Sequence, residues 1–467
     1  LVPSIAQGQF GAEALRFLEP GRFRWHAQPG AAREERIAAY KDPAHHFAVM
    51  THQAFRDDMI HLGAKHAGLS EEAMGQHLAG LGRKERAAWM RETMRREGIA
   101  FDYLNVDEGH DLLNRRGKAN SALANVVDAL SDTAPYYVNA SADPIKNDVS
   151  EAFSLLQKMD PERYTDEAAF MRRYGVDTLA AKEGLRRELA RYQYPSRIDP
   201  DVTAHRSERR LKVSDGQKQA LSELSRNLAR ARVARMQGGV DVQAVKAVSP
   251  DSFKGVPVEQ HEAVARELTR SLGVVKSTAV KRILDAHPTS PKFAEVSRIA
   301  AERKGKPGVV FAHSLAAVEA LRRRLEADGH RVRTITGKDG AKEKGAAIRA
   351  FNPDSGEREA DIIVASDAGA TGANLQSGRW LVQFDTCDTA KGHAQRAGRV
   401  HRIGQNNDVE LIDLVSDHPE EHRARERLRT KYALRDLLTS PMEALDDTGL
   451  GGFLHKRRVG EAHGALF

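Results

Sequence analysis

Short apolar runs recur in two separate series along this chain, and a stretch with helical character follows most of them. The expected strands are 47–51, 101–106 and 136–139 in the first series, and 308–312, 361–365, 380–384 and 409–414 in the second. Strands that alternate with helices form parallel sheets whose two faces are covered by helices. The sequence therefore predicts an α/β fold with two parallel-sheet lobes.

A chain of 467 residues is too long for one hydrophobic core and is expected to form at least two domains. Strand signals fade between the two series, where basic helices dominate, and Pro288 and Pro291 mark the end of that region. We expect a first lobe over 1–165 with a helical insertion at about 57–98, a helical linker over 166–287, a second lobe over 288–438, and a basic, glycine-rich tail over 439–467. Within the insertion, Ser70 followed by Glu71 and Glu72 is typical of a helix N-terminus.

Net positive charge is the feature of the composition that bears on function. The formal net charge is +7 and the pI is about 9.3, which favours a polyanionic partner, nucleic acid above all. The expected helix 222–236 places Leu224, Leu228 and Val233 on one side among many arginines. Two interpretations of this helix stay open, a solvated linker and a surface that faces DNA.

Several classes of protein and site are disfavoured by the sequence. The single cysteine, Cys387, excludes an internal disulfide and a cysteine-rich zinc site, and the nineteen histidines lack the spacing of metal ligands. No apolar run is long enough to span a bilayer, and the first residues lack the regions of a secretory signal. We therefore expect no membrane partner and a cytoplasmic location, in association with the nucleoid.

The segment 395–405 sets two arginines three residues apart, Arg399 and Arg402, beside Gly398, which lets the backbone approach a ligand. Cationic side chains at the end of an α/β unit suit the charge that builds up on a transferring phosphoryl group. Basic runs are more commonly solvated surfaces. The glycines and glutamines interleaved in this run, among them Gln395, favour the catalytic interpretation.

Two adjacent carboxylates, Asp107 and Glu108, directly follow the expected strand 101–106 and precede Gly109 and His110. The carboxyl end of a parallel strand is where α/β sheets bind ligands. One carboxylate there can hold Mg²⁺, and the next can orient or deprotonate an attacking water. Taken alone, such a pair can equally cap the following helix.

A loop of small and polar residues spans 366–376. Its glycines, Gly372 among them, permit close backbone approach, while Ser366, Thr371 and Asn374 offer hydrogen bonds to a phosphodiester. An ordinary glycine-rich loop is the alternative. The position of this loop, one strand and one helix before 395–405, favours the functional interpretation.

In this order, the three segments resemble motifs II, V and VI of superfamily 2 helicases and translocases, in the form typical of the Swi/Snf family. The resemblance extends across nearly the whole chain. Further similar segments are 1–4 to motif Ia, 49–55 to the next strand that contacts nucleic acid, 141–148 to motif III, 290–293 to the start of the C-terminal domain and 309–314 to motif IV. The tripeptide Ser141-Ala142-Asp143 departs from the usual Thr-Gly-Thr of motif III, which puts the coupling of motifs II and III in doubt.

The resemblance implies two RecA-like lobes, joined by a helical segment, that close on ATP and Mg²⁺. It implies that Asp107 serves Mg²⁺, that Glu108 is the catalytic carboxylate, and that Arg399 and Arg402 reach across the cleft. The implied nucleotide-binding residues are Asp107, His110, Gly372 and Gln395. His110 would also couple the state of the nucleotide to the second lobe.

The same resemblance implies a motor that moves along double-stranded DNA and grips mostly its phosphate backbone. The implied contacts are Thr51, Ser366, Thr371 and Asn374. Such a grip predicts little sequence preference and a marked dependence on salt. An RNA-directed motor is the less favoured possibility.

One component of the family pattern is missing from the sequence, the phosphate loop Gly-x-x-x-x-Gly-Lys-[Ser/Thr]. In this family the loop lies just upstream of motif Ia, and the chain opens with Leu1 in what reads as the end of a buried strand. We expect a fragment of a longer polypeptide, with poor ATP turnover on its own. Two alternatives stay open, a DNA-binding scaffold whose ATPase has decayed and the motor of a phage or mobile-element protein fused to a DNA methyltransferase or nuclease.

Overall fold

The computed structural model describes residues 1–2, 23–26, 30–107, 109, 121–140, 149–176, 178–192, 201–353, 357–370 and 373–439. The chain divides into two compact units, Leu1–Arg197 with Lys431–Phe467, and Ile198–Thr430. Motif III, which the sequence places at 141–148, lies outside the described residues, as does the tail from 440 onward.

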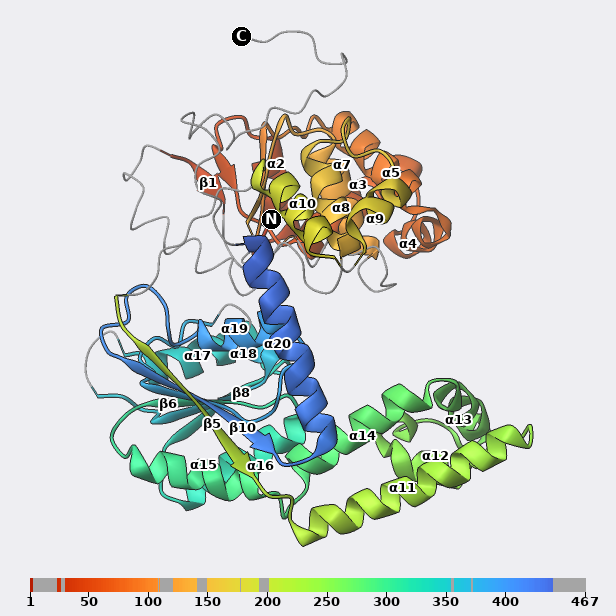
Figure 1. Ribbon diagram of the computed structural model, residues 1–467. Helices are drawn as coiled ribbons and strands as arrows, with labels where there is room; N and C mark the ends of the chain where they lie inside the picture. Colours follow the sequence, from red (N-terminus) through yellow and green to blue (C-terminus); the bar gives the residue numbers. More distant parts are fainter. Residues whose placement is uncertain are drawn as a thin grey trace. The chain divides into compact units, whose positions relative to one another are not determined.

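The first unit contains short parallel strands that lie among helices (Figure 1). β1 (Trp25–His26) pairs with β2 (Phe47–Ala48), and β3 (Tyr103–Asp107) pairs with β4 (Tyr136–Ala140), each in parallel. The segment Leu1–Val2 bridges the two pairs, because the Asp107 N–H donates to the Leu1 carbonyl at 2.9 Å and the Val2 N–H donates to the Met50 carbonyl at 3.0 Å. Leu1 and Val2 are both buried, but the structure assigns no strand to them.

Most helices of the first unit share one hydrophobic core, and α4 (Glu71–Gly80) packs in a smaller cluster of Ala64, Met74 and Leu78. The other helices are α2 (Arg33–Lys41), α3 (His52–Ala67), α5 (Arg83–Glu97), α7 (Ser121–Ser131), α8 (Val149–Met159), α9 (Glu167–Tyr174) and α10 (Leu179–Ala190). Phe170 of α9 and Leu185 of α10 are buried in the shared core, and the Phe170 ring lies 5.3 Å from that of Phe153. The structure therefore packs α9 and α10 into the first unit, whereas the sequence assigned them to a linker that begins at 166.

The expected insertion at about 57–98 consists of α4, α5 and most of α3. Gly68, in the left-handed region with φ of 65°, ends α3, and the Ser70 hydroxyl accepts a hydrogen bond from the Ala73 N–H at the start of α4. Met90 and Met94 of α5 are buried in the core of the first unit. The helical character of this region and the role of Ser70 agree with the sequence.

The second unit is built on a six-stranded parallel sheet with the order β5-β10-β9-β6-β8-β7. Its strands are β5 (Ala204–Leu211), β6 (Gly308–Phe311), β7 (Val332–Ile335), β8 (Ile362–Ala365), β9 (Trp380–Gln383) and β10 (Val409–Ser416). Helices α15 (Pro291–Glu302) and α16 (Leu315–Ala327) lie on one face, and α17 (Ala341–Phe351), α18 (Asp367–Ala370) and α19 (Ala390–Ala397) lie on the other (Figure 1). A separate hydrophobic cluster fills the space on each face, which is the arrangement of a RecA-like lobe.

Two strands of this sheet, β5 and β7, were not predicted from the sequence, and they form its two edges. β5 falls inside the expected linker and pairs in parallel with β10 along its whole length, from Ala204 opposite Val409 to Leu211 opposite Ser416. Its sequence is mostly polar because an edge strand is exposed to solvent along one side. The four central strands, buried on both faces, are the ones that the apolar runs predict.

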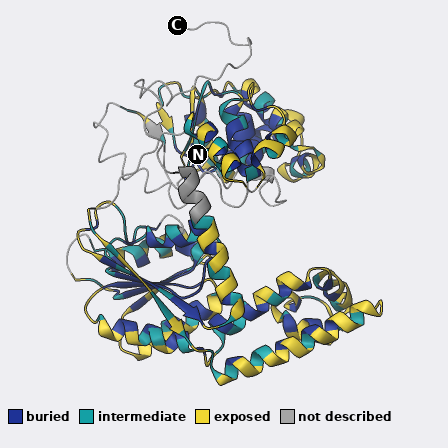
Figure 2. Cartoon of the chain, viewed as in Figure 1, coloured by how far each residue is buried: buried dark blue, intermediate teal, exposed yellow. Residues whose placement is uncertain are grey.

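A helical subdomain projects from the sheet of the second unit (Figure 1). It contains α11 (Asp215–Met236), α12 (Val242–Val248), the 3₁₀ turns η2 (Pro250–Phe253) and η3 (Val258–Gln260), α13 (His261–Arg270) and α14 (Leu272–Ala286). Leu224, Leu228 and Ala231 of α11 lie in its core, whereas Val233 is 53% exposed. The grouping of Val233 with the two leucines was wrong, because helical spacing from Leu228 reaches Ala231 on the same face. Figure 2 shows much of α11 exposed and the sheet strands buried. The last helix, α20 (Pro419–Thr439), follows β10.

Candidate functional site

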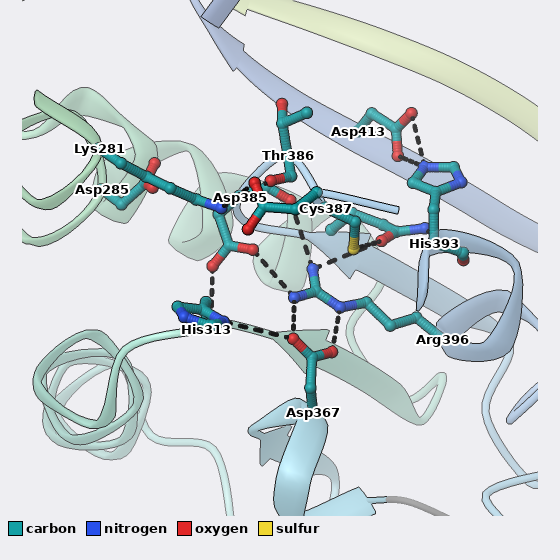
Figure 3. A network of polar contacts seen from close by, with 12 residues as sticks. Lys281, Asp285, His313, Asp367, Asp385, Thr386, Cys387, His393, Arg396 and Asp413 are labelled. Carbon is teal, nitrogen blue, oxygen red and sulfur yellow. Dashed lines mark hydrogen bonds and ion pairs between the residues drawn. The ribbon is translucent and has the colours of Figure 1, made fainter. Parts of the chain in front are cut away.

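A buried arginine organises the carboxyl edge of the six-stranded sheet. Arg396 of α19 is only 2% exposed. Its Nε and Nη2 atoms donate hydrogen bonds to the two carboxylate oxygens of Asp367, at 2.6 and 2.7 Å, and Nη2 also donates to Asp385 Oδ1 at 3.0 Å (Figure 3). Asp367 follows β8 and Asp385 follows β9, so the guanidinium group joins the ends of two neighbouring strands to α19.

His313 brings a third strand end to the same cluster. It follows β6, and its Nδ1 lies 3.6 Å from Asp367 Oδ2. Its backbone N–H donates to the carboxylate of Asp385. Because β6, β8 and β9 run in parallel, their carboxyl ends meet at one edge of the sheet, and this edge is where such sheets bind ligands.

Opposite charges determine the ionisation of this cluster. Burial by itself would raise the pKa of Asp367, but hydrogen bonds from Arg396 and His313 hold that pKa well below its usual range. Burial likewise opposes ionisation of Asp385, and the charges of Arg396 and Lys281 overcome it and lower its pKa. Burial raises the pKa of the neighbouring Cys387 thiol to about 12, although the charge of Arg396 opposes this shift. Asp367 and Asp385 are therefore carboxylates at neutral pH, and the thiol is un-ionised.

The two arginines singled out from the sequence, Arg399 and Arg402, lie just beyond the end of α19 and are both partly exposed. The Arg399 carbonyl accepts a hydrogen bond from the Leu375 N–H at 3.1 Å. Gln405 Nε2 donates to the carbonyls of Gln376, Gly378 and Val400, at 2.7, 3.0 and 3.1 Å. The backbone that carries both arginines is thus fastened to the loop 373–378.

Ser366 and Asn374, two of the predicted loop residues, make local hydrogen bonds. Ser366 is 4% exposed, and its hydroxyl accepts from the Gly369 N–H at 3.2 Å. Asn374 Oδ1 accepts from the Gln376 N–H at 3.2 Å. Gln395 lies on α19, partly buried, one residue before Arg396. Thr371 and Gly372 lie outside the described residues.

Gly369 allows the close approach of α18 to the edge strand β7. A Cβ atom at this position would lie 2.3 Å from the Ile335 carbonyl oxygen, closer than nonbonded atoms approach. The sequence predicted small residues in this loop for approach to a ligand. At Gly369 the backbone that comes close is the chain's own.

In the first unit, Asp107 is the last residue of β3 and is partly exposed. Glu108 and His110 lie outside the described residues, whereas Gly109 is buried. A Cβ atom at Gly109 would lie 2.2 Å from Asn139 Oδ1, so glycine is needed to pack this turn against β4. Thr51 is 8% exposed and caps α3 by accepting from the Ala54 N–H at 3.1 Å.

A second buried ion cluster, which the sequence reasoning missed, joins three helices of the second unit. Lys292 is fully buried on α15, and its Nζ donates to Asp285 of α14 at 2.7 Å and to Glu421 of α20 at 3.0 Å. Thr386, from the loop after β9, donates its hydroxyl to Glu421 at 3.0 Å. A lysine is almost never buried unless it is paired, but the sequence does not show which acids pair with it.

Lys281 connects the helical subdomain to the loop that holds Asp385. It lies on α14, and its Nζ donates to the Thr386 carbonyl at 3.0 Å and to Asp388 Oδ1 at 3.3 Å. The same α14 carries Asp285, so two ionic contacts fix this helix to the carboxyl edge of the sheet. In the part of the chain that the structure describes, no group of three or more histidine, cysteine or acidic side chains could hold a metal ion. Nor is any helix among these residues long and apolar enough to cross a membrane.

Comparisons with known proteins agree with this arrangement. A family model described as the helicase conserved C-terminal domain matches residues 291–404, from the start of α15 to the glycine that follows Arg402 and Ile403. A probable chromatin-remodeling complex ATPase chain of Oryza sativa subsp. japonica is 23% identical over 356 residues, which cover 73% of this chain and 30% of the relative. RNA polymerase-associated protein RapA of Pseudomonas putida (strain GB-1) is 24% identical over 361 residues, 69% of this chain and 35% of the relative.

The chain thus spans about a third of the length of these curated relatives. Among solved structures, the C-terminal part of the Fun30 ATPase domain aligns with 52% of this chain and 98% of its own length, at 13% identity and a TM-score of 0.36. The family model covers 309–314, 366–376 and all but the last residue of 395–405, the segments that resemble motifs IV, V and VI. The matches to the relatives extend over both units. Residues 291–404 thus match the helicase conserved C-terminal domain, and the chain as a whole is similar to chromatin-remodeling ATPases and to RapA.

Proposed function

We propose that this chain is the motor part of a protein that hydrolyses ATP to move along duplex DNA. The observation that carries the proposal is the buried Arg396 cluster, which holds the segment of Arg399 and Arg402 at the carboxyl edge of a parallel sheet. A guanidinium group placed in advance stabilises charge on a transferring phosphoryl group without reorganising during the reaction. Arg399 and Arg402 take this role, and Arg396 positions their segment.

The first unit supplies the groups that act on water and on the metal ion. Mg²⁺ in such sites takes one or two carboxylates and fills its remaining positions with phosphate oxygens and water. Asp107 fits this requirement, because its carboxylate ends a parallel strand and is partly exposed. The ion would neutralise phosphate charge when bound with ATP. Glu108 orients the attacking water and accepts its proton.

Three further residues contact the nucleotide in this proposal: Gln395 on α19, Gly372 in the loop after α18, and His110 after motif II. The role of Gln395 is supported by its position beside Arg396, which fixes the orientation of α19. The roles of Gly372 and His110 are proposed from the sequence resemblance. His110 also links the state of the nucleotide to the second unit.

Duplex DNA is the proposed track, contacted at its phosphates by Thr51, Ser366, Thr371 and Asn374. The hydroxyl oxygens of Thr51 and Ser366 accept backbone hydrogen bonds, which leaves each O–H free to donate to a phosphate. The net charge of +7 favours the same partner. Work on DNA would place the protein at the nucleoid, where an associated DNA-modifying domain would have its substrate.

A triplex-displacement assay on the full-length protein tests this proposal, because a motor that moves along a duplex strips a third strand from it. We expect displacement with ATP and none with a non-hydrolysable analogue. Displacement should weaken as salt rises, since phosphate contacts release counterions. ATP-independent DNA binding without displacement would overturn the proposal in favour of a scaffold with a decayed ATPase.

A further inference from the structure

The distal end of the helical subdomain exposes apolar side chains among arginines. Met236, the last residue of α11, is 87% exposed, and Val274 in the first turn of α14 is 69% exposed. Between them lies an open hollow of about 570 Å³, also lined by Arg232, Arg235, Arg270 and Leu272. Figure 1 shows this end of α11 on the side of the subdomain away from the sheet. We call it the distal hollow.

Arginines are the charged residues that line the distal hollow. From Arg226 to Met236, α11 carries arginines at 226, 230, 232 and 235 and no carboxylate. Arg235 donates to the Thr269 carbonyl at 2.8 Å, and Arg270 pairs with Glu267 on the surface at 2.6 Å. For Arg232 the described residues provide no carboxylate within ion-pair distance. The hollow is therefore positively charged at its rim and apolar at its wall.

The exposed side chains of Met236 and Val274 are not part of the hydrophobic core of the subdomain. Leu224, Leu228 and Ala231 already fill the buried face of α11, and Leu272 and Val275 anchor the start of α14 in the same cluster. Met236 and Val274 point away from that cluster, as their exposure requires. Methionine is well suited to contact surfaces because its flexible, polarisable side chain adapts to different partners.

We propose that the distal hollow binds a short protein segment that carries a large apolar side chain flanked by carboxylates. The apolar side chain packs against Met236 and Val274, and the carboxylates pair with Arg232, Arg235 and Arg270. Charge complementarity at the rim favours an acidic segment, and the exposed methionine favours a protein over nucleic acid. DNA phosphates would use the arginines and gain nothing from burial of Met236 and Val274. A hollow of about 570 Å³ also has the size of a site for a few side chains of a short peptide, not of a duplex.

The probe for this proposal is a short fluorescein-labelled peptide in which leucine alternates with glutamate and aspartate. Two matched peptides separate the contribution of the apolar side chains from that of the carboxylates. One has serine in place of leucine, and the other has lysine in place of the acidic residues. Binding is measured by fluorescence anisotropy on the 467-residue chain without ATP, so that the result does not depend on motor activity. We expect the acidic leucine peptide to bind and both matched peptides to bind at least about fivefold more weakly.

Two substitutions locate the site. Met236→Ser should lower the affinity for the acidic leucine peptide by about five- to tenfold and leave the affinity for duplex DNA unchanged. Val258→Ser is the matched control, because Val258 is 76% exposed on the same subdomain and does not line the hollow. A Met236→Cys chain adds a direct readout, since Cys387 is buried and its raised pKa keeps it unreactive. An environment-sensitive dye at this position should shift to the blue when the peptide binds.

Three results would overturn the proposal. Equal binding of the leucine and serine peptides would show that the hollow is a general polyanion-binding surface. Loss of DNA affinity in Met236→Ser by the same factor as peptide affinity would assign the surface to DNA. Concentration-dependent self-association that disappears in Met236→Ser would assign it to a second copy of the chain.

Discussion

Arg396 and Asp367 are joined by two parallel hydrogen bonds, 2.6 and 2.7 Å long, although 29 positions separate them in the sequence. This pairing connects motif V to motif VI within a single lobe. It is bidentate, which fixes the plane of the guanidinium group as well as its position. The orientation of α19, and of the segment that follows it, therefore depends on an acid that belongs to another motif.

We expect Arg396→Ala to lower the free energy of unfolding of the second unit by about 3 kcal/mol, because it removes the guanidinium group that pairs directly with the buried Asp385. Urea denaturation followed by circular dichroism measures the change. Arg323→Ala is the control: this arginine is 72% exposed in a surface pair with Glu319, and its loss should cost less than about 1 kcal/mol. Equal effects of the two substitutions would contradict a structural role for the Arg396 cluster.

The buried Asp285 predicts a pH-dependent stability. Burial, together with the charges of Glu421 and Asp385 and against the opposing charge of Lys292, raises the pKa of Asp285 to about 7. Because the folded-state pKa lies above the unfolded value near 3.8, its stabilising contribution is complete below about pH 4 and is lost as pH rises through 7. We expect the stability of Asp285→Asn, relative to the parent chain, to increase over this range in urea titrations.

Asp215→Asn is the control for that experiment. Asp215 is 97% exposed, and its pKa is lowered by the hydrogen bond from Lys218, so its titration lies below the same window. The stability of this variant relative to the parent should be constant between about pH 4 and pH 7. If the stability of Asp285→Asn relative to the parent were also constant between about pH 4 and pH 7, the pKa of Asp285 would not be raised in the folded chain.

Gly369→Ala tests the close approach of α18 to β7. The added methyl group would lie 2.3 Å from the Ile335 carbonyl oxygen, and this backbone atom cannot move aside without shifting the strand. We expect a loss of about 1 to 3 kcal/mol in the free energy of unfolding. Gly345→Ala on α17 is the matched control, because only the flexible end of Arg349 is near it, and alanine should be neutral or stabilising there.

The proposed catalytic roles predict different kinetic defects in the full-length protein. Glu108→Gln should abolish ATP hydrolysis and leave ATP binding intact, because the amide cannot accept a proton from water. Arg399→Ala should cut turnover by about a thousandfold with little effect on DNA affinity, because the cation acts on the transition state. Phosphate release and nucleotide titration measure both variants. Parental turnover in either one would show that its assigned role is wrong.

The 467-residue chain alone should hydrolyse ATP poorly, because its sequence has no Gly-x-x-x-x-Gly-Lys-[Ser/Thr] segment to hold the phosphates. DNA-stimulated phosphate release by this chain, compared with the full-length protein, provides the measurement. A robust rate from the chain alone would contradict the expectation.

The sequence alone determined the α/β class, the four central strands of the second unit and the resemblance to Swi/Snf-family ATPases. Each of these rests on short-range information: an apolar run predicts a buried strand, and a motif is a set of residue types at fixed spacing. The insertion helices and the cap at Ser70 followed from the same local rules. The edge strands β5 and β7 did not, because solvent exposure removes the apolar signal that marks a strand.

Only the tertiary structure decided which charged groups meet. Arg396 contacts Asp367 and Asp385 because the carboxyl ends of β8 and β9 are neighbours of α19 in space. Lys292 is paired with Glu421, an acid 129 residues away. Such pairs are set by the packing of whole elements, and no local spacing encodes them. For that reason the arginines at 399 and 402 could be proposed from the sequence, whereas the buried arginine that positions their segment could not.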